Sequence, residues 1–76
     1  MELMVRPAFG FGIGYCDALI YCEVIMDHAS YDVYFNSRWI TTLTYTDDFS
    51  WIQAAGIILP DTIAVEIGKR IEHIYC

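Results

Sequence analysis

Apolar and polar residues alternate along the middle of the chain, which is the pattern of β-strands that bury one face. Four segments show this alternation or the β-branched and aromatic content that is typical of strands. They are 18–26, 31–35, 39–46 and 50–54, and residues that favour turns lie between them. In the first segment every even-numbered residue is apolar, whereas the odd-numbered positions mix apolar residues with Glu23. Residues 18–54 therefore predict a meandering antiparallel sheet of about four strands.

The turn between the second and third segments leaves two registers open. Asn36 tolerates the left-handed conformation that a tight hairpin needs. A three-residue loop at 36–38 would place the odd-numbered residues of 39–46 on the face of Val33, whereas a two-residue loop would place the even-numbered ones there. We favour the three-residue loop, because the odd-numbered set contains the larger apolar residues, among them Trp39 and Leu43.

Residues 7–15 alternate bulky apolar residues with glycine. In an extended chain, Gly10, Gly12 and Gly14 would share one face and let another backbone approach closely. This segment is therefore either a further strand or part of an apolar, glycine-rich arm over residues 1–16.

The last segment of the chain has the period of a helix, at residues 60–75. Pro60 suits the first helical position, and the Asp61 carboxylate suits the positive end of the helix dipole. The apolar residues fall within an arc of about 140°, and Ala64 and Gly68 form a notch of small residues at its edge. The sequence thus predicts a single α+β domain over residues 1–76, with one C-terminal helix packed on one face of the sheet.

Composition and charge exclude several functions for this chain of 76 residues. Ten acidic and four basic residues give a net charge of −6, which disfavours binding to nucleic acid or to an anionic membrane surface. No run of uncharged apolar residues is long enough to span a bilayer. The three cysteines, Cys16, Cys22 and Cys76, are an odd and unpatterned set, so we expect reduced thiols and a cytoplasmic protein.

The candidate catalytic and ligand-binding patterns are weak. Asp27, His28 and Ser30 are the residue types of a hydrolytic triad, but residues crowded into one turn seldom reach one another in the required order. Cys16, Cys22 and His28 share a parity, but six residues of strand, about 20 Å, separate each from the next, too far for ligands of one metal ion unless the chain folds back between them. The glycines of 10–14 lack the spacing of a dinucleotide site. We therefore predict no catalytic residue, no metal ligand and no cofactor, and expect that the protein is not an enzyme.

The chain contains more apolar residues than the core of so small a domain can bury. Hydrophobic residues make up 57% of the chain, and several fall on the sheet face that the predicted helix does not cover. Exposed apolar patches of this kind mark contact sites. The candidate interface residues lie on this face or in the small-residue notch of the helix: Tyr21, Ile25, Tyr34, Ile40, Ala64 and Gly68. We expect a homodimer or, failing that, another protein partner; the alternative is a module that binds a small molecule or a glycan on its aromatic side chains.

The run YDVYFNSRWITTLTYTDDFSWIQAAG, followed by LPDTIAVEIGKRIEHIY, resembles short bacterial proteins of uncharacterised function. These are built as a small antiparallel sheet with a closing C-terminal helix. The resemblance covers about residues 18–75 and implies the fold alone, since no activity or site residue comes with it.

Overall fold

The computed structural model describes residues 7–48 and 50–75. They form one antiparallel sheet of five strands in sequence order, followed by a helix. The elements are β1 (Ala8–Tyr15), β2 (Ala18–Asp27), β3 (Ser30–Phe35), β4 (Arg38–Tyr45), β5 (Trp51–Gly56) and α1 (Asp61–Tyr75). This confirms the predicted α+β fold with a meandering sheet and one C-terminal helix, although the sheet has five strands instead of about four.

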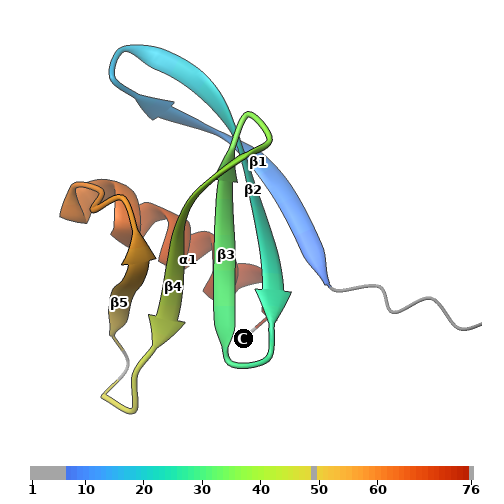
Figure 1. The fold of residues 1–76 in the computed structure, drawn as a ribbon, viewed down its shortest axis with the longest axis vertical. Helices are drawn as coiled ribbons and strands as arrows, with labels where there is room; N and C mark the ends of the chain where they lie inside the picture. The colour runs from blue at the N-terminus through green and yellow to red at the C-terminus, as the bar shows by residue number, and fades with distance from the viewer. Residues whose placement is uncertain (1–6, 49, 76) are drawn as a thin grey trace, which may run out of the picture.

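The additional strand is β1, the segment for which the sequence left a strand and an apolar arm open. β1 pairs with β2 along its whole length, from Ala8 opposite Ile25 to Tyr15 opposite Ala18. The first six residues of the predicted arm lie outside the described residues. In Figure 1 the β1–β2 hairpin extends beyond the other strands at one end of the sheet.

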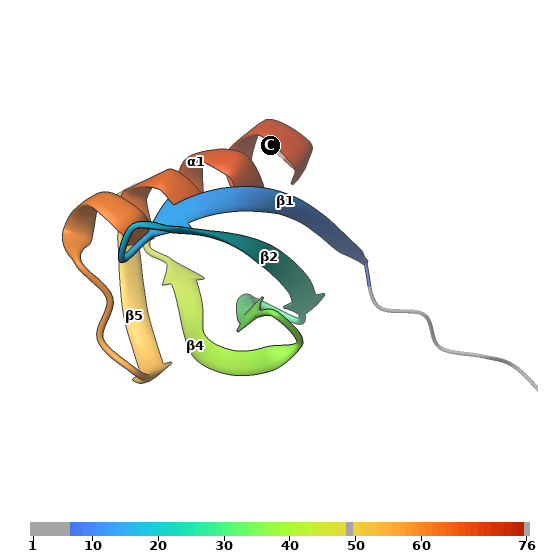
Figure 2. The ribbon, with the colours of Figure 1, turned by 90° about the horizontal axis from the view of Figure 1, so that it is seen from above.

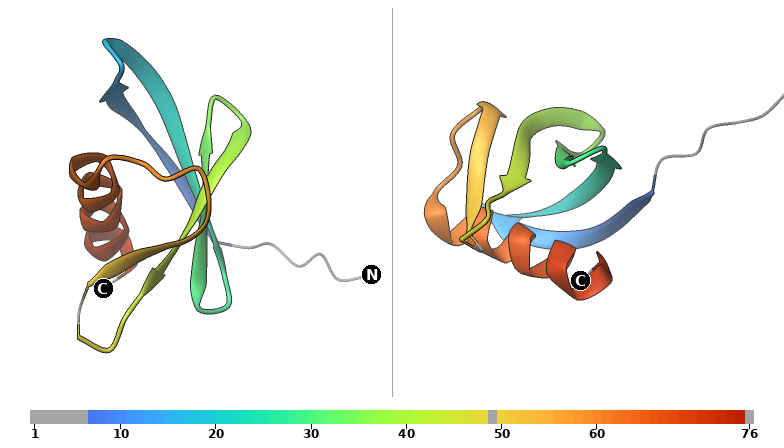
Figure 3. Two further views of the ribbon diagram at one scale, coloured as in Figure 1. Left: turned by 60° about the vertical axis from the view of Figure 1, so that its left-hand side comes forward. Right: turned by 90° about the horizontal axis from the view of Figure 1, so that it is seen from below.

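Helix α1 packs on one side of a strongly twisted sheet, as Figures 2 and 3 show. Its buried residues are Ala64, Ile67, Gly68 and Ile71, which recur at helical spacing on one side. They meet the buried side chains of the central strands, among which Cys22, Val24, Val33 and Leu43 have no exposed surface. Because all of these side chains point to the same side of the sheet, the opposite side has no cover from within the described chain.

The hairpin between β3 and β4 has a two-residue loop, so the predicted three-residue loop is wrong. Phe35 pairs with Arg38, and the loop residues Asn36 and Ser37 have φ angles of 50° and 70°, as in the turns that match the twist of a hairpin. A register shift beside Val33 then inserts one extra residue in β4, a β-bulge. The bulge reverses the alternation, which decides the side to which each later residue of β4 points.

Because of the bulge, the predicted face is correct for the residues of β4 that follow it and wrong for Trp39, which precedes it. Thr41 pairs with Val33 and is fully buried, so the odd-numbered residues after the bulge do share the core face. Before the bulge the alternation is reversed, and Trp39 pairs with Tyr34 on the opposite face. The prediction that Trp39 lies beside the core residues of β3 is therefore wrong.

Candidate functional site

The side of the sheet away from α1, which we call the outer face, carries the largest exposed apolar side chains of β2 to β4. Cross-strand partners share a face, so the pairing of Glu23 with Tyr34, and of Tyr34 with Trp39, places all three on this side. The exposed fractions of Leu19, Tyr21 and Trp39 are 83%, 53% and 44%. The outer face is defined here by these residues: Leu19, Tyr21, Glu23, Ile25, Asp32, Tyr34 and Trp39.

Two of these side chains, Tyr21 and Leu19, pack on glycine residues of β1. A Cβ atom on Gly10 would overlap the ring of Tyr21, and one on Gly12 would come within 3.3 Å of the Leu19 side chain. An aromatic ring packed over a glycine of the neighbouring strand is a recognised way to stabilise an edge strand. The alternating glycines therefore position Tyr21 and Leu19, which is a role that the sequence pattern alone did not indicate.

Hydrogen bonds hold the polar part of the outer face in place. The Trp39 indole N–H donates to Thr42 Oγ1 (3.3 Å), and the Thr42 hydroxyl donates to Asp32 Oδ1 (2.7 Å). Asn36 binds the backbone of Tyr21 twice, because its backbone N–H donates to the Tyr21 carbonyl oxygen and its side-chain oxygen accepts from the Tyr21 N–H. These contacts fix the Trp39 ring and the Tyr21 backbone, while Trp39 and Tyr21 remain 44% and 53% exposed.

Three of the six residues predicted as an interface, Tyr21, Ile25 and Tyr34, lie on the outer face. Ile40, which is predicted on the same face, does not lie there. It is at the bulge of β4, is half-buried and packs against the core. Trp39 takes its place on the outer face. The signal that points to Trp39 is the two-residue loop, because Asn36-Ser37 at a tight turn puts Trp39 opposite Tyr34.

The predicted notch of Ala64 and Gly68 is filled by a side chain of the same molecule. Ala64 is only 7% exposed, and a Cβ atom on Gly68 would lie 2.5 Å from Cδ1 of Trp51. The Trp51 indole N–H donates to Glu72 Oε2 (2.8 Å), which holds the ring against the helix. Gly68 thus serves the packing of β5 on α1 and is not open to a partner.

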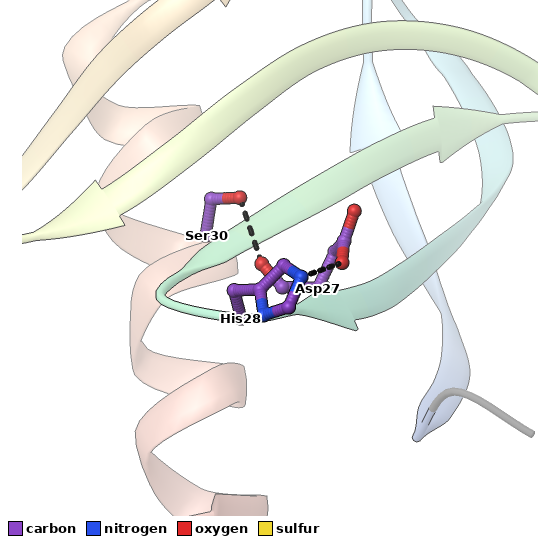
Figure 4. A network of polar contacts seen from close by, with 3 residues as sticks. All are labelled: Asp27, His28 and Ser30. Carbon is purple, nitrogen blue, oxygen red and sulfur yellow. Dashed lines mark hydrogen bonds and ion pairs between the residues drawn. The ribbon is translucent and has the colours of Figure 1, made fainter. Parts of the chain in front are cut away.

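The turn between β2 and β3 has no triad geometry (Figure 4). The Ser30 hydroxyl donates to the backbone oxygen of Asp27 (3.0 Å), and His28 is 96% exposed, with Nε2 3.7 Å from Asp27 Oδ1. A triad requires the histidine to bond the nucleophilic hydroxyl, whereas this hydroxyl bonds the local backbone. Ser30 therefore caps the turn through the local backbone.

The acidic side chains and cysteines do not form a metal site within residues 7–48 and 50–75, where no three His, Cys, Asp or Glu side chains come together. In the turn after β4, hydrogen bonds from Thr46 and Ser50 hold the pKa of the Asp48 carboxyl below its usual value. Cys16 is exposed in the turn between β1 and β2, whereas Cys22 is buried. Burial raises the pKa of the Cys22 thiol to about 12.

The two cysteines are therefore expected to differ in reactivity, since the thiolate is the nucleophile. Iodoacetamide near neutral pH should alkylate Cys16 in the native protein and leave Cys22 unmodified, as read by mass spectrometry of the digested peptides. In urea both residues should react, which serves as the control. Alkylation of Cys22 in the native protein at the rate of Cys16 would contradict the burial of its side chain in the core.

Among the described residues, no helix has the length and apolar character needed to cross a membrane. Comparison of the chain with protein-family models, with curated proteins and with solved structures finds no match.

Proposed function

We propose that the protein is a non-catalytic interaction protein that binds a partner polypeptide on the outer face of its sheet. The observation that carries the proposal is the exposure of three large apolar side chains, Leu19, Tyr21 and Trp39, on one side of the sheet. The solvated face of an antiparallel sheet is usually polar, whereas contiguous apolar surface marks a contact site. Half-buried Tyr34 lies between Glu23 and Trp39, and half-buried Ile25 follows Glu23 on the same face of β2, so both extend the patch.

The charges of the outer face favour a basic partner. Glu23 and Asp32 stand among the aromatic residues, and Arg38 pairs with Phe35, so that its position belongs to the face of the core. A two-fold contact of this face with itself would bring carboxylates together, which is unfavourable. Arginine or lysine side chains of a different polypeptide would pair with the carboxylates and stack on Tyr21 or Trp39.

A peptide library displayed on phage tests this proposal directly. We expect the protein to select peptides that combine arginine or lysine with apolar residues. Their affinity should fall at least tenfold for Trp39→Ala, since aromatic anchors dominate such contacts, and for Leu19→Asp, since it puts an unpaired charge into the apolar contact. The matched control is Ile58→Asp, because Ile58 is as exposed as Leu19 (84% and 83%) but lies in the segment before α1.

The proposal fails if the selected peptides bind the Leu19→Asp and Trp39→Ala variants as tightly as the original protein. It also fails if they show no enrichment in basic residues. The second candidate, a module that binds glycans or flat metabolites, is favoured by Trp39, which is 44% exposed and adjacent to Tyr34. A glycan array that gives binding lost in Trp39→Ala, with no peptide selected, would favour this second function.

A further inference from the structure

A second surface of the molecule lies where the edge strand β5 meets α1, away from the outer-face patch (Figure 1). A groove of about 660 Å³ runs between these elements, with Trp51 and Ala64 among the residues that line it. Ile52 on β5 and Val65 on α1 also line the groove and are 50% and 48% exposed. An apolar side chain on each element is thus left in contact with solvent.

The helix side of the groove has a charge pattern that is complementary to itself. Asp61, Val65 and Lys69 follow one another at intervals of four residues, so they form one stripe along α1. If two copies of α1 packed antiparallel with Val65 at the two-fold axis, Asp61 of each copy would face Lys69 of the other. Opposite charges at such positions fix the register of an interface and exclude wrong pairings.

The strand side of the groove also suits a copy of itself. Within residues 7–48 and 50–75, β5 is the last strand of the sheet, so no described strand pairs with its outer edge. If the two-fold axis that pairs the helices also passes beside β5, the two β5 edges meet antiparallel, because a two-fold contact joins the same patch of both protomers. Ile52 pairs with Thr44 and so points to the side of the sheet away from α1; on the α1 side, the apolar side chain that the contact covers is Val65.

We propose that a second copy of this chain docks along the groove between β5 and α1, and that the protein is a two-fold homodimer through this surface. The partner is a copy of the chain because the stripe of Asp61, Val65 and Lys69 is complementary to itself, whereas the charges of the outer face are not. The dimer leaves both outer faces free, so this proposal does not depend on the peptide-binding function proposed above.

The first experiment measures mass by light scattering on a sizing column at micromolar protein concentrations. We expect twice the monomer mass of 8.7 kDa for the original protein. Val65→Asp should give the monomer mass with an unchanged far-ultraviolet circular dichroism spectrum, because Val65 is half exposed and its replacement leaves the core intact. Leu19→Asp on the outer face is the control and should remain dimeric.

The second experiment tests the register through charge reversal. Asp61→Lys alone would place lysine opposite Lys69 of the other copy, and Lys69→Asp alone would place aspartate opposite Asp61, so each variant should self-associate at least tenfold more weakly. An equimolar mixture of the two variants pairs opposite charges at both contacts and should recover the dimer. The mixture separates a loss of the contact from a loss of folding, because an unfolded variant would not be rescued.

Several outcomes would overturn the proposal. A mass of 8.7 kDa at all concentrations would show that the chain does not dimerise. A dimer that survives Val65→Asp but is lost in Leu19→Asp would place the contact on the outer face. A mixture of the two charge variants that stays monomeric, while each retains its circular dichroism spectrum, would contradict the antiparallel pairing of α1.

Discussion

The Gly68→Val variant is expected to lower the free energy of unfolding by about 3 kcal/mol. The Trp51 ring lies where the new side chain would stand, with Cδ1 2.5 Å from the position of a Cβ atom. Overpacking of this kind costs about 1–3 kcal/mol, and loss of the Trp51–Glu72 hydrogen bond adds about 1.5–3 kcal/mol, since one partner is charged. Valine has a better helix propensity than glycine, but this offsets the loss of stability by only about 0.3 kcal/mol.

Urea unfolding followed by far-ultraviolet circular dichroism measures this loss, and a double-mutant cycle assigns it. In the Trp51→Ala background the ring is absent, so Gly68→Val should cost much less than it does in the original protein. The difference between the two costs is the coupling between Gly68 and Trp51. If Gly68→Val is neutral or stabilising in the original protein, the close contact between α1 and β5 is not present in solution.

The second large effect is expected for Leu43→Ala, which should destabilise the domain by about 2–5 kcal/mol. Leu43 is fully buried on β4 and belongs to the core cluster with Ile67 and Ile71 of α1. A domain of this length has a total stability of roughly 4–11 kcal/mol, so the loss is a large part of it. Leu19→Ala is the matched control, because the same change at an 83% exposed position should alter stability by no more than about 0.5 kcal/mol.

Thermal and urea unfolding of the two leucine variants give the comparison. Because the domain is small, each 1 kcal/mol lost should lower the melting temperature by roughly 4–8 °C. A large loss for Leu19→Ala would mean that the outer face is covered, and the dimeric state of that variant would then show whether a second copy covers it. Equal, small effects for both variants would contradict the assignment of Leu43 to the core.

The candidate surface could be predicted in part from alternation alone. The strict period of two in β2 and β3, in which neighbouring residues point to opposite faces, predicts the uncovered side for Tyr21, Ile25 and Tyr34. A strict period through β4 puts Trp39 on the wrong face, since the hairpin loop has two residues and the β-bulge after Trp39 then changes the period. A bulge is a local departure from regular pairing, so the period of apolar residues cannot predict it.

The notch of Ala64 and Gly68 shows that a sequence pattern can predict a close contact without identifying the group that makes it. Small residues at helical spacing indicate a close approach, and such an approach does occur at Gly68. The pattern does not say which group approaches, and the occupant is Trp51, seventeen residues earlier in the chain. The same holds for the glycines of β1, whose close neighbours are the side chains of β2.

Periodicity and local propensity by themselves determined the order of the elements, the α+β fold with a closing C-terminal helix, and most residues of the core face. These depend on contacts between near neighbours, which the order of residues encodes directly. Only the tertiary structure decided that β1 joins the sheet, that Trp51 occupies the place beside Gly68, and that Trp39 faces outward. It also decided where the excess of apolar residues lies, on the outer face and along the groove between β5 and α1. These features depend on which distant segments meet and in which register, and packing settles that choice among several arrangements with similar local energies.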